Sequence, residues 1–378
     1  MDSLDSKKLI RLSKSCINEA EKKAVMKVLD AEFLGMGIDV NGFEKSLSNY
    51  FERDVVCVST GTAALQLALQ AAGIGKNDEV LVQSLTYVAT FQAISATGAK
   101  PIACDIDPST FCIDIKDAEK RITKNTKAIM PVHYCGGVGD IEGIYSFAEN
   151  YNLRVIEDAA HAFGTSFKNK RIGSFGDIAC FSFDGIKNIT SGEGGCIVTN
   201  DKKVTSIAKD IRLLGVEKDT EKRYSGSRSW DFDVKTQGWR YHMSNIMAAI
   251  GSTQLSNFNF SSKKRQELAK HYIERLKNCH EIKLIPLNYD DVVPHIFVVE
   301  LQDKIDRDQI RKKLSDKNIQ TGIHYKPNHW LTYYKDKKAH PLSNTDRVFG
   351  RLLTLPLHTD LEVSDVDEVC NHFIDALI

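Results

Sequence analysis

The sequence lacks an excess of charge of either sign. Its 378 residues include 50 Lys plus Arg and 50 Asp plus Glu, so the formal net charge is zero. A chain without net positive charge has no general attraction for nucleic acid or for an anionic membrane surface. We therefore expect neither of these as a partner.

Long apolar runs are also missing. No run approaches the ~20 residues that a helix needs to span a bilayer. Met1 to Asp5 do not form the basic segment, followed by an apolar stretch, that begins a signal peptide. These two absences predict a cytoplasmic protein.

Cysteine motifs are absent as well. The nine cysteines are an odd number, and no two of them form a CxxC pair. This spacing argues against a disulfide framework and against a zinc site. His324, Tyr325 and His329 lie close together in sequence, but no acidic or cysteine residue stands at ligand spacing beside them. We therefore expect no metal.

What the sequence does contain is an alternation of β-rich apolar runs with helical patterns. Hydrophobic residues make up 42% of the chain, enough for a substantial core. The alternation predicts an α/β fold with a mainly parallel sheet and helices on both faces. Seven strands are expected to begin near Val55, Glu79, Pro101, Lys127, Arg154, Ile178 and Gly195.

The connection before the last of these strands is too short for a parallel crossover. No helical pattern lies between Phe183 and Gly195, so the last strand should run antiparallel in a mixed sheet. Beyond Asn200 the pattern changes to an irregular polar stretch, and a helix follows from Ser244. We predict a large unit over residues 1–258 and a smaller α/β unit over residues 259–378.

The segment VVCVSTGTAALQLAL, from Val55, predicts a strand, a tight turn and a helix. The turn contains Gly61, and the helix opens at Thr62. The first N–H groups of a helix lack partners and lie at its positive end, so they can bind a phosphate. An ordinary helix cap would give the same pattern.

Two further motifs carry reactive side chains. Asp158 ends a strand in VIEDAAHAFG, where it could hold a protonated pyridine nitrogen, and His161 follows it. Lys187 lies in the loop CFSFDGIKNITSGEGG, where a desolvated amine would suit a Schiff base. A capping acid with a structural histidine, and a solvated hairpin lysine, are the alternatives. Together with a phosphate site, however, these groups are what pyridoxal phosphate (PLP) requires of a protein.

At these residues the chain resembles the DegT/DnrJ/EryC1/StrS family of PLP-dependent sugar aminotransferases. The resemblance implies the aspartate aminotransferase fold, PLP fold type I. It covers nearly the whole chain and is carried by GMGIDVNGFEKSLSNYF, STGTAAL, TYVAT, GAKPIACDID, MPVHYCGG, IEDAAHAFGTSF, GSFGDIACFSF, KNITSGEGG, AAIGSTQL, GIHYKP and LLTLPLH.

The resemblance also implies a role for each matching residue. Lys187 and Asp158 would be catalytic. Tyr87 would stack on the pyridine ring, and His161 would contact its phenolic oxygen. The phosphate would be bound by Gly61, Thr62 and Ser182. Glu193, His324 and Tyr325 would contact the substrate, the last two from the partner subunit.

Arg240 marks a departure from the family pattern. Many relatives have Gly-x-Asn-Tyr-Arg-Met where this chain has residues 238–243, and Arg240 replaces the Asn. In the relatives that Asn reaches the phosphate in the neighbouring subunit. Arg240 would keep a phosphate donor at this position, and the resemblance implies a homodimer with shared active sites.

The implied reaction moves an amino group from L-glutamate to a nucleotide-linked keto sugar, with a 4-keto sugar preferred. PLP would alternate with its amino form, pyridoxamine phosphate (PMP), and the amino sugar would serve an O-antigen, another surface glycan or a natural product. Two alternatives stay open: a keto-inositol (aminocyclitol) aminotransferase and a non-catalytic PLP-binding regulator. A dehydratase branch of the family has His in place of the lysine, so Lys187 argues against that branch.

Overall fold

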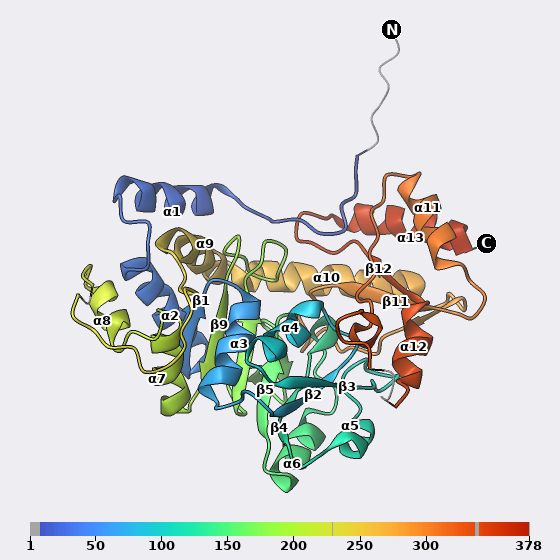
Figure 1. The fold of residues 1–378 in the computed structure, drawn as a ribbon. Helices are drawn as coiled ribbons and strands as arrows, with labels where there is room; N and C mark the ends of the chain where they lie inside the picture. The colour runs from blue at the N-terminus through green and yellow to red at the C-terminus, as the bar shows by residue number, and fades with distance from the viewer. Residues whose placement is uncertain (1–7, 229, 337–339, 378) are drawn as a thin grey trace.

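The computed structural model describes residues 8–228, 230–336 and 340–377. Its central feature is a seven-stranded sheet with the order β1-β9-β8-β5-β4-β2-β3 (Figure 1). The strands are β1 Asp54–Val58, β2 Glu79–Gln83, β3 Lys100–Cys104, β4 Thr126–Met130, β5 Arg154–Asp158, β8 Ile178–Ser182 and β9 Gly195–Thr199. Each begins within one residue of its predicted start.

The direction of the last strand is confirmed. β9 pairs antiparallel with both of its neighbours, β1 and β8. The pairs from β8 through β5, β4 and β2 to β3 are all parallel. Parallel strands place their carboxyl ends along one edge of the sheet, where ligands of α/β proteins bind.

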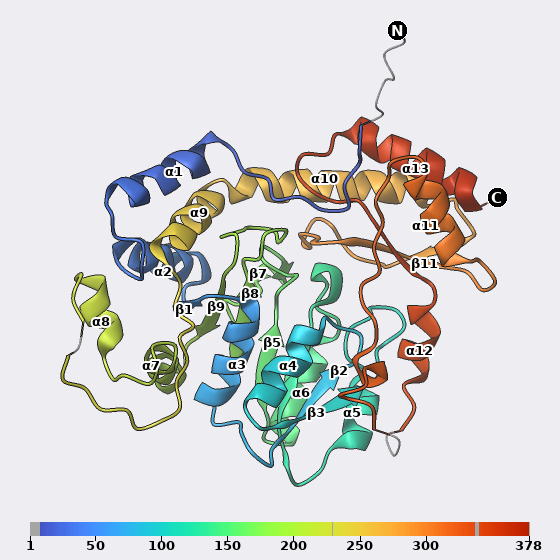
Figure 2. The same cartoon turned by 45° about the horizontal axis from the view of Figure 1, so that its top comes forward.

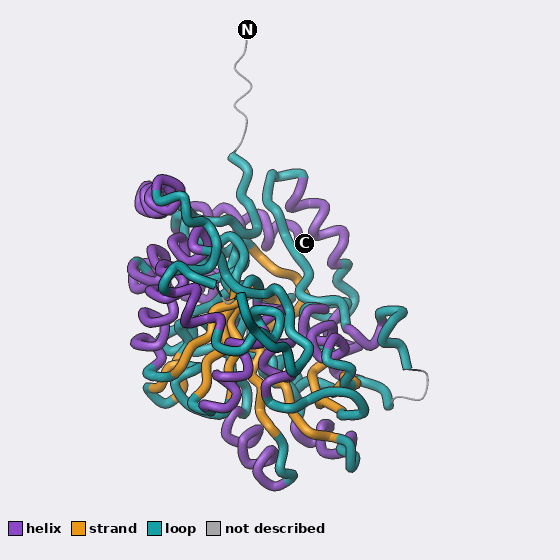
Figure 3. The backbone as a smooth tube through the Cα atoms, turned by 60° about the vertical axis from the view of Figure 1, so that its left-hand side comes forward, coloured by secondary structure: helices purple, strands orange, loops and turns teal. Residues whose placement is uncertain are grey.

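Helices cover both faces of this sheet, as Figures 1 and 3 show. One face packs against α3 Gly61–Ala71, α4 Val88–Ala96 and α7 Lys202–Ile211. The opposite face packs against α2 Ile38–Phe51, α5 Ile115–Arg121 and α6 Ile141–Asn150. The mixed α/β fold predicted from the alternating pattern is therefore confirmed.

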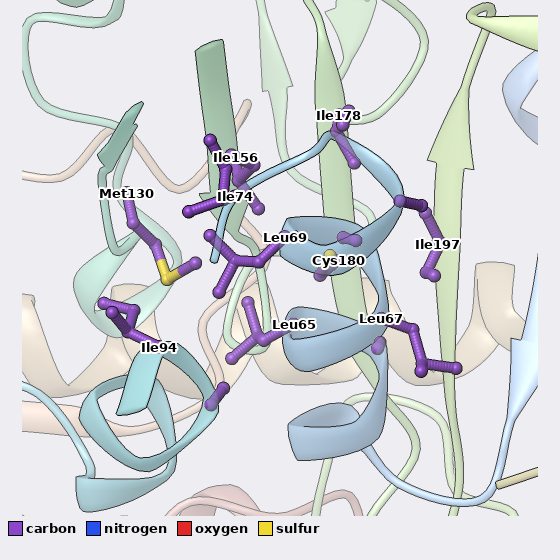
Figure 4. Packing of buried hydrophobic residues seen from close by; sticks show 14 of the residues in the cluster. Leu65, Leu67, Leu69, Ile74, Ile94, Met130, Ile156, Ile178, Cys180 and Ile197 are labelled. Atoms are coloured by element: carbon purple, nitrogen blue, oxygen red, sulfur yellow. The ribbon is translucent and has the colours of Figure 1, made fainter. Parts of the chain in front are cut away.

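Alternation along single strands explains how both faces become apolar. In β1, Val56 and Val58 belong to the core beneath α3, whereas Val55 and Cys57 belong to the core beneath α2. Successive side chains of a strand point to opposite faces, so a strand buried on both sides is continuously hydrophobic. Figure 4 shows Leu65 of α3 packed among residues of the first core.

A second, three-stranded sheet lies in the C-terminal part of the chain. It contains β10 Ile282–Leu284, β11 Phe297–Leu301 and β12 Leu352–Leu355, all antiparallel. It shares a separate core with α10 Phe258–Leu276, α11 Arg307–Ser315 and α13 Val363–Leu377. In Figure 2, α10 runs from beside α9 to α13.

Residue Ile10 joins the N-terminal segment to the C-terminal core. It is buried in the C-terminal core and pairs with Ile319. Sequence order alone did not predict this, and the division into residues 1–258 and 259–378 stays a prediction. The remaining elements are α1 Glu19–Asp30, β6 Ser166–Phe167, β7 Lys170–Arg171, α8 Asp219–Tyr224, α9 Asn245–Ser256, α12 Ser343–Phe349 and two 3-10 turns, Tyr134–Gly136 and Asn328–Trp330.

No helix within the described ranges is both long and apolar enough to cross a membrane. The cytoplasmic location stays a prediction.

Candidate active site

A cavity of about 440 Å³ lies at the carboxyl edge of the large sheet. The ends of β5 and β8, the first turns of α3 and α4, and the β8–β9 connection all contribute to its wall. All residues predicted for the site line this cavity except Arg240. They are Gly61, Thr62, Tyr87, Asp158, His161, Ser182, Lys187, Glu193, His324 and Tyr325.

The amino end of α3 forms one side of the cavity. Thr60 caps this helix, because its hydroxyl accepts from the N–H of Ala63 at 3.0 Å. Within the described residues, the N–H groups of Gly61 and Thr62 have no hydrogen-bond partner. They are therefore free to bind an anion at the positive end of the helix.

Gly61 is needed where α3 meets β8. A Cβ atom on Gly61 would lie 2.7 Å from the Cβ of Ser182, closer than side-chain carbons approach one another. The absence of a side chain lets the helix start lie directly beside the end of β8. The Ser182 hydroxyl thereby lies close to Gly61 at the start of α3.

Asp158 lies at the end of β5, the strand that pairs with β8. Thr90 donates a hydrogen bond of 2.7 Å to Oδ2, and the N–H of Ala160 donates one of 3.2 Å to Oδ1. The carboxyl group is buried, and burial raises its pKa above the ordinary 3.8 even though these hydrogen bonds lower it. A cation beside Asp158 would restore the charged form.

Lys187 is not a solvated hairpin lysine. Its amino group faces the cavity, and Nζ lies 3.2 Å from Nε2 of His295. Burial lowers the pKa of Lys187 to about 8, although Asp158 and Asp184 act in the opposite direction. An appreciable fraction of the amine is therefore neutral, and so nucleophilic, near pH 8.

Several neutral side chains surround the amine. The hydroxyl of Tyr325 lies 3.0 Å from Nε2 of His161, and burial depresses the pKa of His161 well below 6.5. His324 contacts Thr354 at 2.8 Å, and burial lowers its pKa to about 4. At neutral pH both imidazoles are therefore uncharged.

Tyr87 and Glu193 line the more open part of the cavity. Tyr87 is 59% exposed, and its ring centroid lies 5.6 Å from that of Tyr325. Glu193 is exposed in the β8–β9 connection, and its pKa is raised chiefly by partial burial. Both side chains are accessible to a ligand that enters the cavity.

Two predictions about position need correction or qualification. His324 and Tyr325 were expected to act in the partner subunit, but they lie in the cavity of their own chain. The segment that carries them is held there because Gly322 exchanges two backbone hydrogen bonds with Thr354 of β12. Arg240 lies outside this cavity and is exposed, and its backbone forms an antiparallel β-bridge with Leu213. Its role stays a prediction.

Three residues that act on Asp158 or Lys187 were not predicted. His295 precedes β11, Thr90 lies in the first turn of α4, and Asp184 lies in the β8–β9 connection. Asp184 stands within the motif that pointed to Lys187, so its position was a usable signal. His295 begins the apolar run HIFVVEL, and a histidine at such a place indicates a site residue less clearly than Asp184 does.

The residues present fit pyridoxal phosphate. Free N–H groups and a hydroxyl would bind the phosphate, a buried carboxylate would pair with a protonated ring nitrogen, and a partly neutral lysine would attach to the carbonyl carbon. The cavity is also of the size that small-molecule sites have, about 300–1,000 Å³.

Comparison with known proteins is consistent with this chemistry. The model of the DegT/DnrJ/EryC1/StrS aminotransferase family matches residues 15–374. The spore coat polysaccharide biosynthesis protein SpsC of Bacillus subtilis is 35% identical over 363 residues, which are 93% of each chain.

Solved structures of similar proteins share the fold along the whole chain. PseC of Helicobacter pylori, an aminotransferase involved in pseudoaminic acid biosynthesis, gives a TM-score of 0.91 at 27% identity, with 98% of this chain and 99% of PseC covered. Spr1654 of Streptococcus pneumoniae has been solved in PLP and PMP forms. Each form gives a TM-score of 0.89 at 28% identity, with 98% of both chains covered.

Proposed function

Because the chain belongs to the DegT/DnrJ/EryC1/StrS aminotransferase family, we propose that it moves an amino group from L-glutamate to a nucleotide-linked keto sugar. It is a PLP-dependent sugar aminotransferase; the nucleotide, the 4-keto position and glutamate are the finer parts of the proposal. One observation carries the chemistry: the amine of Lys187 and the carboxyl group of Asp158 line the same cavity as the free N–H groups of α3.

When bound, PLP supplies a carbonyl carbon that links to amines and a ring that takes up electrons from the carbon next to the transferred nitrogen. We infer that Asp158 keeps a proton on the ring nitrogen, since a buried carboxylate favours a cation beside it. Thr90 holds this carboxylate in place through its 2.7 Å hydrogen bond.

Lys187 is proposed to act as the base and then as the acid. Its pKa of about 8 allows the amine to take a proton from carbon and to return it at neutral pH. His161 would orient the cofactor from the side of its phenolic oxygen. Tyr87 would cover the ring, and Glu193, His324 and Tyr325 would contact the substrate.

A homodimer is part of the proposal. Within the described residues, no arginine lines the cavity, although a phosphate group favours a cationic partner. Arg240 is exposed and could serve a second copy of the chain. Large apolar side chains are also exposed along α1 and into α2, and a partner would bury them. They are Met26, Leu29, Phe33, Leu34 and Ile38.

The product is proposed to be an amino sugar for a surface polysaccharide, such as an O-antigen. The descriptions of SpsC and PseC support this direction, because they refer to spore coat polysaccharide biosynthesis and to the biosynthesis of pseudoaminic acid. Within the described residues, no feature favours an aminocyclitol or a regulatory role over this proposal.

The test has two steps on the purified full chain. Borohydride reduction after incubation with PLP should attach the pyridoxyl group to Lys187, as read by peptide mass spectrometry. A panel of nucleotide-linked 3- and 4-keto sugars with L-glutamate should then give 2-oxoglutarate and an amino sugar with at least one member. Labelling of a different lysine would refute the site. An unchanged absorbance spectrum with glutamate, and no turnover with any sugar, would favour the regulatory alternative.

A further inference from the structure

His295 is a buried residue whose chemistry the proposed reaction does not yet use. It is 3% exposed and stands two residues before β11. Its Nε2 lies 3.2 Å from Nζ of Lys187, and its ring centroid lies 4.5 Å from that of His161. Nδ1 has no hydrogen-bond partner in the described part of the chain. The polar contact of this ring is therefore made with the reactive amine.

This contact can persist whether or not Lys187 carries an extra proton. A neutral imidazole has one donor nitrogen and one acceptor nitrogen, whereas an ammonium group has donors only. Protonated Lys187 would donate to Nε2, and the neutral amine could pair in either sense after a change of tautomer. A side chain with donors only, such as arginine or a second lysine, could not partner the protonated amine.

We propose that His295 is a positioning residue that holds the Lys187 amine while it transfers a proton during the amino-transfer reaction. The inference rests on the proposed function. The proton leaves the carbon on one side of the transferred nitrogen, is carried on Nζ, and is returned to the carbon on the other side. The electron pair left on the first carbon is delocalised into the cofactor ring, so no external oxidant or reductant is needed.

The groups that face Lys187 leave this task to His295. Asp158 from β5 and Asp184 from the β8–β9 connection favour the ammonium, and Arg265 from α10 disfavours it. His161 and His324 also surround the amine, and burial depresses the pKa of both well below neutrality. No carboxylate of the described chain forms an ion pair with Nζ. Nε2 of His295 is thus available as an uncharged acceptor.

A packing role is the competing explanation. The ring lies against His161, and a phenyl ring would fill much of the same space without accepting a hydrogen bond. Glutamine can accept through its side-chain oxygen but has no ring. Comparison of His295→Phe and His295→Leu with His295→Gln therefore separates packing from positioning.

The first measurement is the pH dependence of Lys187 acetylation in the full chain loaded with PMP, by competitive labelling with acetic anhydride and peptide mass spectrometry. His295→Phe and His295→Leu should shift the midpoint downward by about one pH unit, because the ammonium loses an acceptor while its burial remains. His295→Gln should bring the midpoint most of the way back to the wild-type value. His358→Phe is the matched control, since His358 is also buried but lies outside the cavity, and it should cause no shift.

The second measurement is the rate of the half-reaction between the PLP form and L-glutamate, followed by absorbance. The Phe and Leu variants should lose about tenfold in the rate at saturation with little change in the half-saturating glutamate concentration. Thermal unfolding of each variant identifies a folding defect. If the Phe variant does not fold, the Leu variant is the acceptor-free protein that is compared with the Gln variant. Wild-type midpoints and rates in either folded acceptor-free variant would overturn the inference. Failure of wild type to be labelled at Lys187 by borohydride would instead overturn the proposed function.

Discussion

Two buried charged clusters in this molecule differ in how far their charges are matched. The first joins Arg212, which follows α7, to Glu44 of α2 at 2.5 Å, and Tyr224 of α8 donates to the same carboxylate. Arg212 also donates to the carbonyl of Cys57 at 2.6 Å, and the neighbouring N–H of that residue donates to Glu44. The second cluster is the one around Lys187 and Asp158.

The charges of the second cluster are not matched within the chain, and we call it the open cluster. Lys187 forms no ion pair within the described ranges, and the carboxylate of Asp158 accepts hydrogen bonds there only from the Thr90 hydroxyl and the N–H of Ala160. In the first cluster burial acts to lower the pKa of Arg212, but Glu44 and Tyr224 outweigh it and raise the pKa, whereas burial lowers the pKa of Lys187 to about 8. Matched buried charges hold elements together, and unmatched ones are expected where a ligand supplies the missing partner.

The largest expected effect on stability comes from breaking the matched cluster. Glu44→Ala should lower the free energy of unfolding by about 3–5 kcal/mol, because Arg212 would keep a buried charge without a partner. Urea unfolding followed by circular dichroism measures this change. Glu19→Ala, which removes the exposed pair with Lys22, is the control and should cost about 0–1 kcal/mol. A loss at position 44 no larger than at position 19 would contradict the assignment.

Asp158→Asn should chiefly lower activity rather than stability. Amino transfer should slow by about 10²–10³-fold, because a neutral amide no longer keeps the ring nitrogen protonated. Turnover with the best sugar of the panel and the yield of folded protein are the two measurements. Near-normal turnover would mean that another residue performs this function.

The pH dependence of the same variant follows from the direction of the pKa shift. Burial raises the pKa of Asp158 in the folded, cofactor-free chain above 3.8. Its contribution to stability is therefore present below 3.8 and is lost as the pH rises through the folded value. Cofactor-free wild type should lose stability over this window relative to Asp158→Asn, as urea midpoints at successive pH values would show. Parallel curves would contradict the burial of this charge.

The open cluster was largely predictable from local sequence, because the ends of adjacent strands meet at one edge of a sheet. Asp158 and Ser182 each end a strand, and Lys187 lies in the connection that follows. All seven strands of the large sheet were also predicted, since a strand buried on both faces is a short continuous apolar run between turns.

Contacts between distant segments were not predictable in the same way. Lys187 and His295 are separated by 108 positions, and Arg212 and Glu44 by 168. No spacing rule connects such residues, because their distance depends on how α2, α7 and the C-terminal core pack. The same reason explains the correction for His324, whose position depends on pairing with β12 rather than on any local pattern.

The smallest expected effect concerns what completes the open cluster. If the second copy of the chain supplies Arg240 to the phosphate, then Lys187→Ala and Arg240→Ala inactivate a site from different subunits. His324 lies in the cavity of its own chain, so it belongs with Lys187 in such a test and not with Arg240. Mixing the two single variants under conditions of subunit exchange should restore about a quarter of wild-type turnover, because about half of the dimers are mixed and each has one intact site of two.

Mixing Lys187→Ala with His324→Ala is the matched control. In a mixed dimer one site then lacks Lys187 and the other lacks His324, so neither site is intact. The activity of the mixture should be no higher than that of the His324→Ala protein it contains. The matched Arg212 cluster is formed within one chain. Mixing Glu44→Ala with another variant should therefore not restore its free energy of unfolding. Absence of recovery by Arg240→Ala, with exchange demonstrated by mass spectrometry of tagged subunits, would mean that each chain binds the phosphate alone.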